Sequence, residues 1–442
     1  MPSSLVSAND NSRLAVRDLV CVFALALAIR LIFVIFYQWA PEDAIGYDAL
    51  ASNLLAGNGF SWDLTPPYYP NLFRTPVYPV FLASIYAVAG HHDTVVYLVQ
   101  AVIGSATCCL TYLIARRYWD RRVALIAGLL SATYLHAAYF VSAKLTETVF
   151  TFLMCGAIYF VIVALQKQNW RLMVAAGLAM GLAILCRPEA MLFPLILLPL
   201  LLVPRHSRLA RLKLASVLVI ATFVILVPWF IRNSQVSGRR MGLVSHGPGL
   251  IFWQTTLPYF NWNTFVYGPG SEHDPLVRTL TTEQLTFNQA ADLEPAFWRA
   301  GFENILRDPK AYLLRRVREY PHFWISGGSY LLGRHNRSFG EAVAQRRYPL
   351  ILVKLFLIFV IDLFPLMLGL TGVFISWGRL WELLPLWAPI LYVAVFRLPF
   401  DYTPRYTLPL HPYVLTFAAV GAVFLWTKFS KRRSLQSAGR YA

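Results

Sequence analysis

The sequence predicts an all-α polytopic membrane protein, a bundle of about ten spanning helices with a range of roughly nine to twelve. Three observations lead to this fold class. Of the 442 residues, 57% are hydrophobic and only 14% are charged, whereas a soluble chain carries roughly a quarter charged residues. The apolar residues gather in runs long enough to cross a bilayer. The net charge of +17 resides mainly in short loops between these runs, which is typical of cytoplasmic loops and argues against a nucleic-acid partner.

The first apolar run, residues 19–39, follows Arg13 and Arg17. It is too long for the apolar part of a signal peptide, and no small-residue cleavage site follows it. We therefore interpret it as a spanning helix with a cytoplasmic N-terminus. By the same hydropathy argument, the other spanning helices are expected over residues 94–115, 123–140, 145–165, 171–186, 189–204, 212–231, 350–376, 380–397 and 405–427.

The apolar stretch at residues 76–90 decides the topology. It is short for a span and contains Pro79, so we expect a helix that lies in the interface or re-enters the membrane, with Thr75 as its N-cap and Pro76 at its first position. With this stretch outside the membrane, the densest basic clusters and both termini face the cytoplasm. These clusters are at residues 116–122, 205–213 and 428–433.

The chain then divides into three parts. Residues 1–231 form an N-terminal membrane module whose first outer loop, 41–93, begins with a second interfacial helix that carries Tyr47, Leu50 and Leu54 at helical spacing. Residues 232–349 form a large outer loop in which Asp308-Pro309 opens an amphipathic helix. Residues 350–442 return to the membrane and end in a basic cytoplasmic tail. The five cysteines all lie in apolar runs, which favours neither a disulfide framework nor a zinc site.

The first outer loop opens with an acidic pair, Glu42-Asp43. Asp43 suits an N-cap for the following helix. A carboxylate at a membrane–water boundary can also act as a general base on an acceptor hydroxyl. Glu42 would tune that base or help it to bind a divalent cation, which is the only cofactor that the residues suggest.

Other charged residues fall on the same outer face. Arg74, Arg187 and Arg405 offer the fork geometry that binds phosphate. Snorkelling to lipid headgroups would also explain Arg74, and pairing with Glu189 would also explain Arg187. Lys144 and Glu147 are three apart, so they would pair with each other or line the same cavity as Asp43.

His411 follows two prolines at the entrance of the last span. A structural, hydrogen-bonded histidine is the more common outcome at such a position, and a catalytic histidine is the alternative.

Taken together, the chain resembles the GT-C membrane glycosyltransferases, specifically the protein-mannosyltransferase and aminoarabinose-transferase-like superfamily. The motifs that carry the resemblance run in order along residues 20–425. They are Glu42-Asp43 with Tyr47, Leu50-Ala51 and Gly57-Asn58-Gly59-Phe60, Arg74-Thr75-Pro76-Val77-Tyr78-Pro79, Leu145-Thr146-Glu147, Arg187-Pro188-Glu189, Pro228-Trp229 with Arg232-Asn233, and Arg405-Tyr406 with Leu408-Pro409 and Pro412.

The resemblance implies transfer of a hexosyl or pentosyl group from a polyprenyl-phosphate donor to an extracytoplasmic acceptor (a glycan, lipid or protein), usually with inversion. It also implies a multi-pass protein of the plasma (inner) membrane, in contact with membrane lipids. Asp43 falls on the family's base, Glu147 on its second acidic position and Arg74 on a phosphate contact. Some GT-C enzymes bind a divalent ion at an acidic motif like Glu42-Asp43, and others work without one.

Two other functions use similar lipids. A transporter or flippase for lipid-linked sugars needs charged residues across the depth of the membrane and often has repeated halves. Here the charges concentrate at the outer edge, and the sequence shows no internal repeat. An O-antigen ligase or polymerase is the other alternative, in which case the Glu42-Asp43 pair would be incidental.

Overall fold

The structure, a computed structural model, is helical over nearly all the residues that it describes. These are residues 3–197, 207–238, 244–245, 247–258, 260–261, 266–268, 271–282, 293–325, 331–332 and 339–438. One short antiparallel pair interrupts the helices, in which β1 (Phe260–Asn261) lies beside β2 (Val266–Tyr267), with Phe260 opposite Tyr267.

The N-terminal half supplies most of the bundle. Its helices are α1 (Ser3–Phe36), α2 (Glu42–Ala56), α3 (Val77–Ala89), α4 (Asp93–Arg116), α5 (Arg121–Thr133), α6 (Leu135–Tyr139), η1 (Phe140–Ser142), α7 (Glu147–Lys167), α8 (Trp170–Cys186), η2 (Pro188–Ala190), α9 (Phe193–Ile196) and α10 (Arg208–Ser237).

The remaining helices form a peripheral layer and then return to the bundle. The peripheral helices are α11 (Pro248–Thr256), η4 (Ser271–His273), α12 (Pro275–Thr282), α14 (Glu294–Arg307), α15 (Pro309–Glu319), α16 (Pro321–Trp324) and α17 (Phe339–Ala344). The returning helices are α18 (Tyr348–Leu357), the π-helical η6 (Ile358–Leu363), α19 (Phe364–Ile375), η7 (Trp377–Arg379), α20 (Leu384–Phe396), η8 (Pro404–Leu410) and α21 (His411–Ala438).

Several of these helices are long and apolar enough to cross a membrane, which makes the chain a multi-pass membrane protein. Six such helices occur among the described residues, and α5 with α6 makes a seventh if this pair, bent by 47°, counts as one span. The helices α3, α8 and α20 are apolar but shorter. The predicted count of about ten spans is therefore not confirmed.

The predicted span at 189–204 differs most from the structure. The short helices η2 and α9 occupy its first part, because Pro188 and Pro194 interrupt a continuous hydrogen-bond ladder. Residues 198–204 lie outside the described residues, as does part of the large outer loop.

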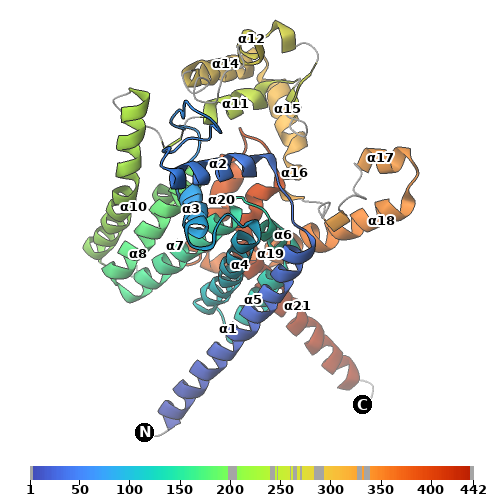
Figure 1. Cartoon of the computed structure of the whole chain (residues 1–442). Coiled ribbons are helices and arrows are strands. Elements are labelled where there is room, and N and C mark those ends of the chain that lie inside the picture. Colours follow the sequence, from blue (N-terminus) through green and yellow to red (C-terminus); the bar gives the residue numbers. More distant parts are fainter. Residues whose placement is uncertain are drawn as a thin grey trace.

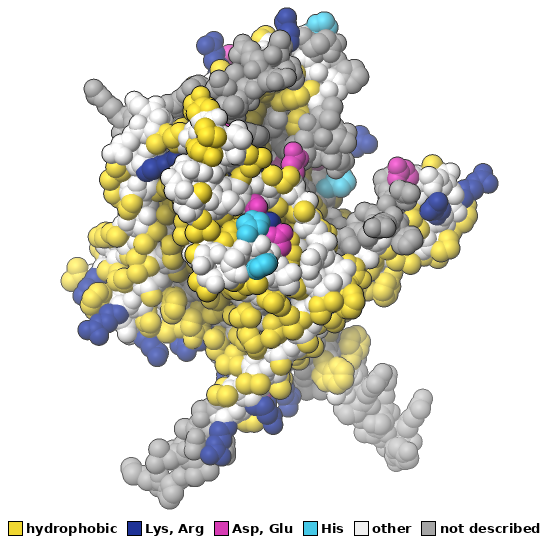
Figure 2. Space-filling model, in the orientation of Figure 1, with side chains coloured by type: hydrophobic (Ala, Val, Ile, Leu, Met, Phe, Trp, Pro, Cys, Tyr) yellow, Lys and Arg dark blue, Asp and Glu magenta, His cyan; other side chains and the backbone are white. Residues whose placement is uncertain are grey.

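Both termini lie at the same end of the bundle, while α2 and the peripheral helices α11, α12 and α14 lie at the other (Figure 1). Figure 2 shows a mainly hydrophobic face on the bundle, with Lys and Arg side chains gathered toward the end where the N-terminus lies. This arrangement agrees with termini in one compartment. Which compartment that is stays a prediction.

Small residues allow close contact between neighbouring helices. A Cβ atom on Gly181 of α8 would lie 2.7 Å from the Cβ of Ile225 and 2.9 Å from the carbonyl oxygen of Thr222, both on α10. A Cβ on Gly372 of α19 would lie 1.9 Å from the carbonyl oxygen of Phe417 on α21. Such close approach is typical of helix pairs in membranes, where packing rather than water exclusion drives association.

The helices expected around the first outer loop are present, but their caps differ from the prediction. Thr75 is not the N-cap of α3, because Pro76 occupies that position and the Thr75 hydroxyl donates to the carbonyl oxygen of Cys186 at 3.1 Å. This bond ties the start of α3 to the end of α8. The cap predicted for α15 is confirmed, since Asp308 accepts a hydrogen bond from the Ala311 amide at 2.9 Å.

Candidate functional site

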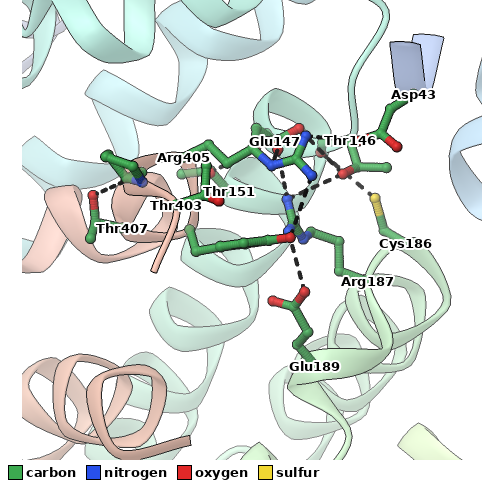
Figure 3. A network of polar contacts seen from close by, with 12 residues as sticks. Asp43, Thr146, Glu147, Thr151, Cys186, Arg187, Glu189, Thr403, Arg405 and Thr407 are labelled. Atoms are coloured by element: carbon green, nitrogen blue, oxygen red, sulfur yellow. Dashed lines mark hydrogen bonds and ion pairs between the residues drawn. The ribbon is translucent and has the colours of Figure 1, made fainter. Parts of the chain in front are cut away.

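Four carboxylates and four guanidinium groups form one continuous series of alternating charges, which we call the charge ladder. They come from α2, the segment before α3, the start of α7, η2 with the residue before it, the segment after α20, and η8. In order, its members are Asp401, Arg397, Glu189, Arg187, Glu147, Arg405, Asp43 and Arg74. The central members converge in Figure 3.

Asp43 lies near one end of the ladder, with both of its oxygens engaged. Its Oδ1 lies 2.5 Å from Nη2 of Arg74, and its Oδ2 lies 2.7 Å from Nη1 of Arg405. Burial alone would raise the pKa of Asp43, but the two arginine charges and their hydrogen bonds outweigh burial and hold the pKa well below its usual range. The carboxylate is therefore ionised at neutral pH.

The N-cap interpretation of Asp43 is wrong. Pro41 is the N-cap residue of α2, and Asp43 lies in the first turn of this helix. There the helix dipole favours a negative charge, and the side chain is free to reach the two arginines.

Arg74 is fixed by the turn that precedes α3. The side chain of Asn71 accepts hydrogen bonds from the backbone amides of Phe73 and Arg74. The guanidinium donates from Nη1 to the Tyr47 hydroxyl at 3.1 Å and lies 4.7 Å from the centre of the Tyr47 ring. Tyr47 thus contacts Arg74, and Arg74 in turn contacts Asp43.

Glu147 and Arg187 occupy the centre of the ladder. Glu147 is 2% exposed, and its Oε1 lies 2.9 Å from Nη1 of Arg187 and 3.8 Å from Nε of Arg405. Arg187 also donates to the hydroxyl of Thr146 at 3.3 Å. Burial opposes the charge of Arg187, but the neighbouring carboxylates of Glu189 and Glu147 raise its pKa. The structure therefore joins Glu147 to Arg187 and not to Lys144.

Lys144 belongs to a separate cluster. Its Nζ lies 2.8 Å from Oδ1 of Asp48 on α2 and 2.8 Å from Oδ1 of Asp93 at the start of α4. Asp48 also accepts a hydrogen bond from the Tyr86 hydroxyl at 2.6 Å and contacts His91 at 3.1 Å. This cluster fastens the helix that carries Asp43 to the rest of the bundle.

His411 and Glu42 do not join the ladder. The Nδ1 atom of His411 lies 2.8 Å from the carbonyl oxygen of Thr407, so it must donate, and Nε2 then accepts from the Tyr134 hydroxyl at 2.5 Å. Both ring nitrogens are occupied, which favours the structural interpretation. Glu42 is exposed, and the ion pairs between described residues do not include it.

A divalent cation, which the sequence left open, does not fit these residues. Within the described ranges, no group of three His, Cys, Asp or Glu side chains is arranged to hold a metal ion. Both oxygens of Asp43 already contact positive charges, and a cation would have to displace these arginines. No step below therefore involves a metal.

Two pockets adjoin the centre of the ladder. The first is mainly apolar, and Arg187, Glu189 and Tyr406 form its polar end. Its apolar lining comes from α7, η2, α9, α20 and η8, and consists of Phe150, Met154, Ala190, Phe193, Pro389, Tyr392, Val393, Phe396, Pro409 and Leu410. The second is lined by Glu147, Arg30 and His411 together with hydroxyl-bearing and apolar side chains.

Sequence reasoning missed three members of this site. They are Arg397, Asp401 and Tyr406, to which no role in the site was assigned from the sequence. Arg397 lies 2.9 Å from Asp401, and its guanidinium stacks 3.3 Å from the centre of the Tyr406 ring. The spacing of four residues between Arg397 and Asp401 was a usable signal.

The comparisons with known proteins agree with this architecture. Residues 73–231 match the family described as dolichyl-phosphate-mannose-protein mannosyltransferase. Comparison with curated protein sequences finds no match.

Among solved structures, the chain is similar to the oligosaccharyltransferase of Archaeoglobus fulgidus. The apo form has a TM-score of 0.53 and 14% identity, covering 95% of this chain and 52% of that one. The complex of AglB with an inhibitory peptide and a dolichol-phosphate has a TM-score of 0.54 and 14% identity, with the same coverage. ArnT from Cupriavidus metallidurans bound to undecaprenyl phosphate has a TM-score of 0.42 and 18% identity, and the match covers 91% of this chain and 77% of that one.

The chain spans about half the length of the archaeal enzyme that it matches. At this level of identity, the likeness concerns the fold. This likeness of fold and the family match over residues 73–231 agree with the resemblance to GT-C membrane glycosyltransferases that the sequence motifs carry.

Proposed function

We propose that the protein transfers a hexosyl or pentosyl group from a polyprenyl-phosphate donor to an extracytoplasmic glycan, lipid or protein, with inversion at the anomeric carbon. One observation carries this proposal. An ionised carboxylate, Asp43, is held between two arginines, Arg74 and Arg405, in a charge ladder whose next arginine, Arg187, lies at the polar end of an apolar pocket.

The ladder has capacity for an incoming anion. Among the described residues, the buried Nε atoms of Arg74 and Arg405 have no hydrogen-bond partner. A phosphodiester can accept hydrogen bonds from these donors, and arginine forks suit phosphate geometry. The apolar pocket beside Arg187 would take the first isoprene units, while the rest of the prenyl chain stays in the bilayer.

The proposed chemistry needs a base and a stabilised leaving group on opposite faces of the sugar. The acceptor hydroxyl attacks the anomeric carbon and gives its proton to Asp43, while the bond from that carbon to the phosphate oxygen breaks. The electron pair of this bond leaves with polyprenyl phosphate, whose growing negative charge Arg74, Arg187 and Arg405 would stabilise.

Donor binding would also prepare the base. In the structure, Asp43 is a weak base because two guanidinium groups stabilise its charged form. When the donor phosphate attracts Arg405, Asp43 loses part of that stabilisation and its proton affinity rises. Glu147, 2.9 Å from Arg187, would hold that arginine in position while Arg405 moves.

The proposal places the site on the extracytoplasmic side of the inner membrane. The basic clusters and the shared end of the two termini support this orientation (Figure 1).

The test is reconstitution of the purified protein into liposomes with polyprenyl-phosphate sugars and with glycan, lipid or protein acceptors, followed by measurement of released polyprenyl phosphate. Hexosyl and pentosyl donors are supplied separately, and Arg405→Gln serves as the impaired variant. We expect release with at least one donor and a large loss in the variant. If no donor is consumed while the lipid crosses the bilayer, the protein is a transporter and the proposal is wrong.

A further inference from the structure

Glu189 lies where an arginine-bound anion would be expected. Its Oε1 lies 3.3 Å from Nη2 of Arg187 and 2.5 Å from Nη2 of Arg397. Glu189, Arg187 and Tyr406 together form the polar end of the apolar pocket. The side chain of Glu189 is 30% exposed, whereas those of Arg187 and Arg397 are 9% and 4% exposed. The carboxylate thus has a path toward solvent that the two arginines lack.

Both arginines would stay in place without Glu189. Arg187 is held by Glu147 at 2.9 Å and by the Thr146 hydroxyl. Arg397 is held by Asp401 at 2.9 Å and by the ring of Tyr406. Asp401 is itself oriented by the Thr403 hydroxyl at 2.8 Å. The two guanidinium groups are therefore positioned by residues on either side of Glu189.

We propose that Arg187 and Arg397 form a subsite for the donor phosphate, and that the Glu189 carboxylate occupies this subsite until the donor displaces it. The proposal rests on the function proposed above and adds Arg397 and Glu189 to the site. Among the described residues, the Nε atom of Arg397 is buried without a hydrogen-bond partner, so this arginine has a donor left for a second phosphate oxygen.

The charges of the ladder favour such an exchange. Its four carboxylates and four guanidinium groups are formally neutral together. A phosphodiester donor carries one negative charge, so it replaces one carboxylate without changing this balance. The product is a phosphate monoester with a charge of roughly −1.5 to −2 at neutral pH. Glu189 returning to the arginines competes with that product and speeds its release.

Binding of undecaprenyl phosphate to the full-length protein in lipid nanodiscs tests this exchange. Glu189→Gln removes the competing charge and keeps the side-chain size, so it should bind undecaprenyl phosphate roughly tenfold more tightly, a change of about 1.4 kcal/mol. Arg397→Gln should bind it at least about tenfold more weakly. Glu303→Gln, which removes a carboxylate from an exposed pair with Arg299, is the matched control and should bind like wild type.

A turnover readout separates competition from a structural role. In Glu189→Gln, KM and the inhibition constant of undecaprenyl phosphate should both fall, and kcat should fall with them if product release limits the rate. If Glu189→Gln binds undecaprenyl phosphate more weakly than wild type, Glu189 holds the arginines in place and the inference is wrong.

Glu189→Asp supplies a second variant, because its shorter carboxylate cannot bridge both arginines. It should bind more tightly than wild type, and weaker binding again overturns the inference. Failure of the proposed function looks different, since the wild type itself would then neither bind undecaprenyl phosphate nor consume a donor.

Discussion

Arg74→Gln should move the acid limb of the pH–rate profile. The substitution removes the positive charge 2.5 Å from Oδ1 of Asp43 and leaves Arg405 as the remaining partner. In the wild type, the two arginines overcome burial and lower the pKa of Asp43. With one arginine gone, burial outweighs more of the remaining charge stabilisation, so the pKa of Asp43 rises. Protonation then inactivates the base at a higher pH than in the wild type.

The distance sets the size of the effect. For unit charges 2.5 Å apart, Coulomb's law gives about 7 kcal/mol at an effective dielectric constant of roughly 20, and about 2 kcal/mol in bulk water. Asp43 and Arg74 are both partly exposed, so the effective interaction falls between these limits. Loss of one adjacent opposite charge typically raises a carboxyl pKa by roughly 1 to 3, and the acid limb should move to higher pH by about that much.

The assay is kcat/KM for release of polyprenyl phosphate between pH 3 and pH 8, because this ratio reports the ionisation of the free enzyme. In the wild type, kcat/KM should show no change caused by Asp43 over most of this range, because the Asp43 carboxylate stays ionised. Arg299→Gln, which loses an exposed pair with Glu303, should keep the wild-type profile. An Arg74→Gln profile that is lower but has its acid limb at the same pH would refute the assignment of Asp43 as the base.

Two further predictions concern stability in detergent, measured by thermal unfolding. Lys144→Met leaves the carboxylates of Asp48 and Asp93 without the amine that joins them and should destabilise the fold by about 1–3 kcal/mol; an unchanged melting temperature would show that α2 is fastened elsewhere. Gly181→Ala places a carbon 2.7 Å from a side chain of α10 and should cost about 1–3 kcal/mol. Gly156→Ala, where nothing lies within 4 Å, should be nearly neutral, and equal melting of the two alanine variants would contradict the packing account.

Hydropathy predicted the long helices well because the signal is local. The spans α1, α4, α7 and α10 lie where continuous apolar runs occur in the sequence. The end of a helix at Cys186 was predicted, but a continuous span after it was not found, because hydropathy does not report that Pro188 and Pro194 leave only the short helices η2 and α9 there. The bend between α5 and α6 was missed for the same reason, since an apolar run continues through it.

The site was predicted in composition but not in its pairing. The face assigned from topology correctly grouped Asp43, Arg74, Arg187 and Arg405, which the ladder joins. The partners could not be read from spacing, because the contact between Asp43 and Arg405 spans 362 positions. The spacing of three residues suggested a pair between Lys144 and Glu147 that does not form. Lys144 pairs with Asp48, and Glu147 pairs with Arg187.

The role of Asp43 is tested most directly by single-turnover release of polyprenyl phosphate from bound donor in wild type and Asp43→Asn. Asparagine keeps the size of the side chain and one acceptor oxygen, so it can accept a hydrogen bond from one of the two arginines. It cannot take a proton. We predict that donor binding persists and that the rate of release falls by roughly 10²- to 10⁴-fold, the range for loss of a general base. Release at the wild-type rate would contradict the account.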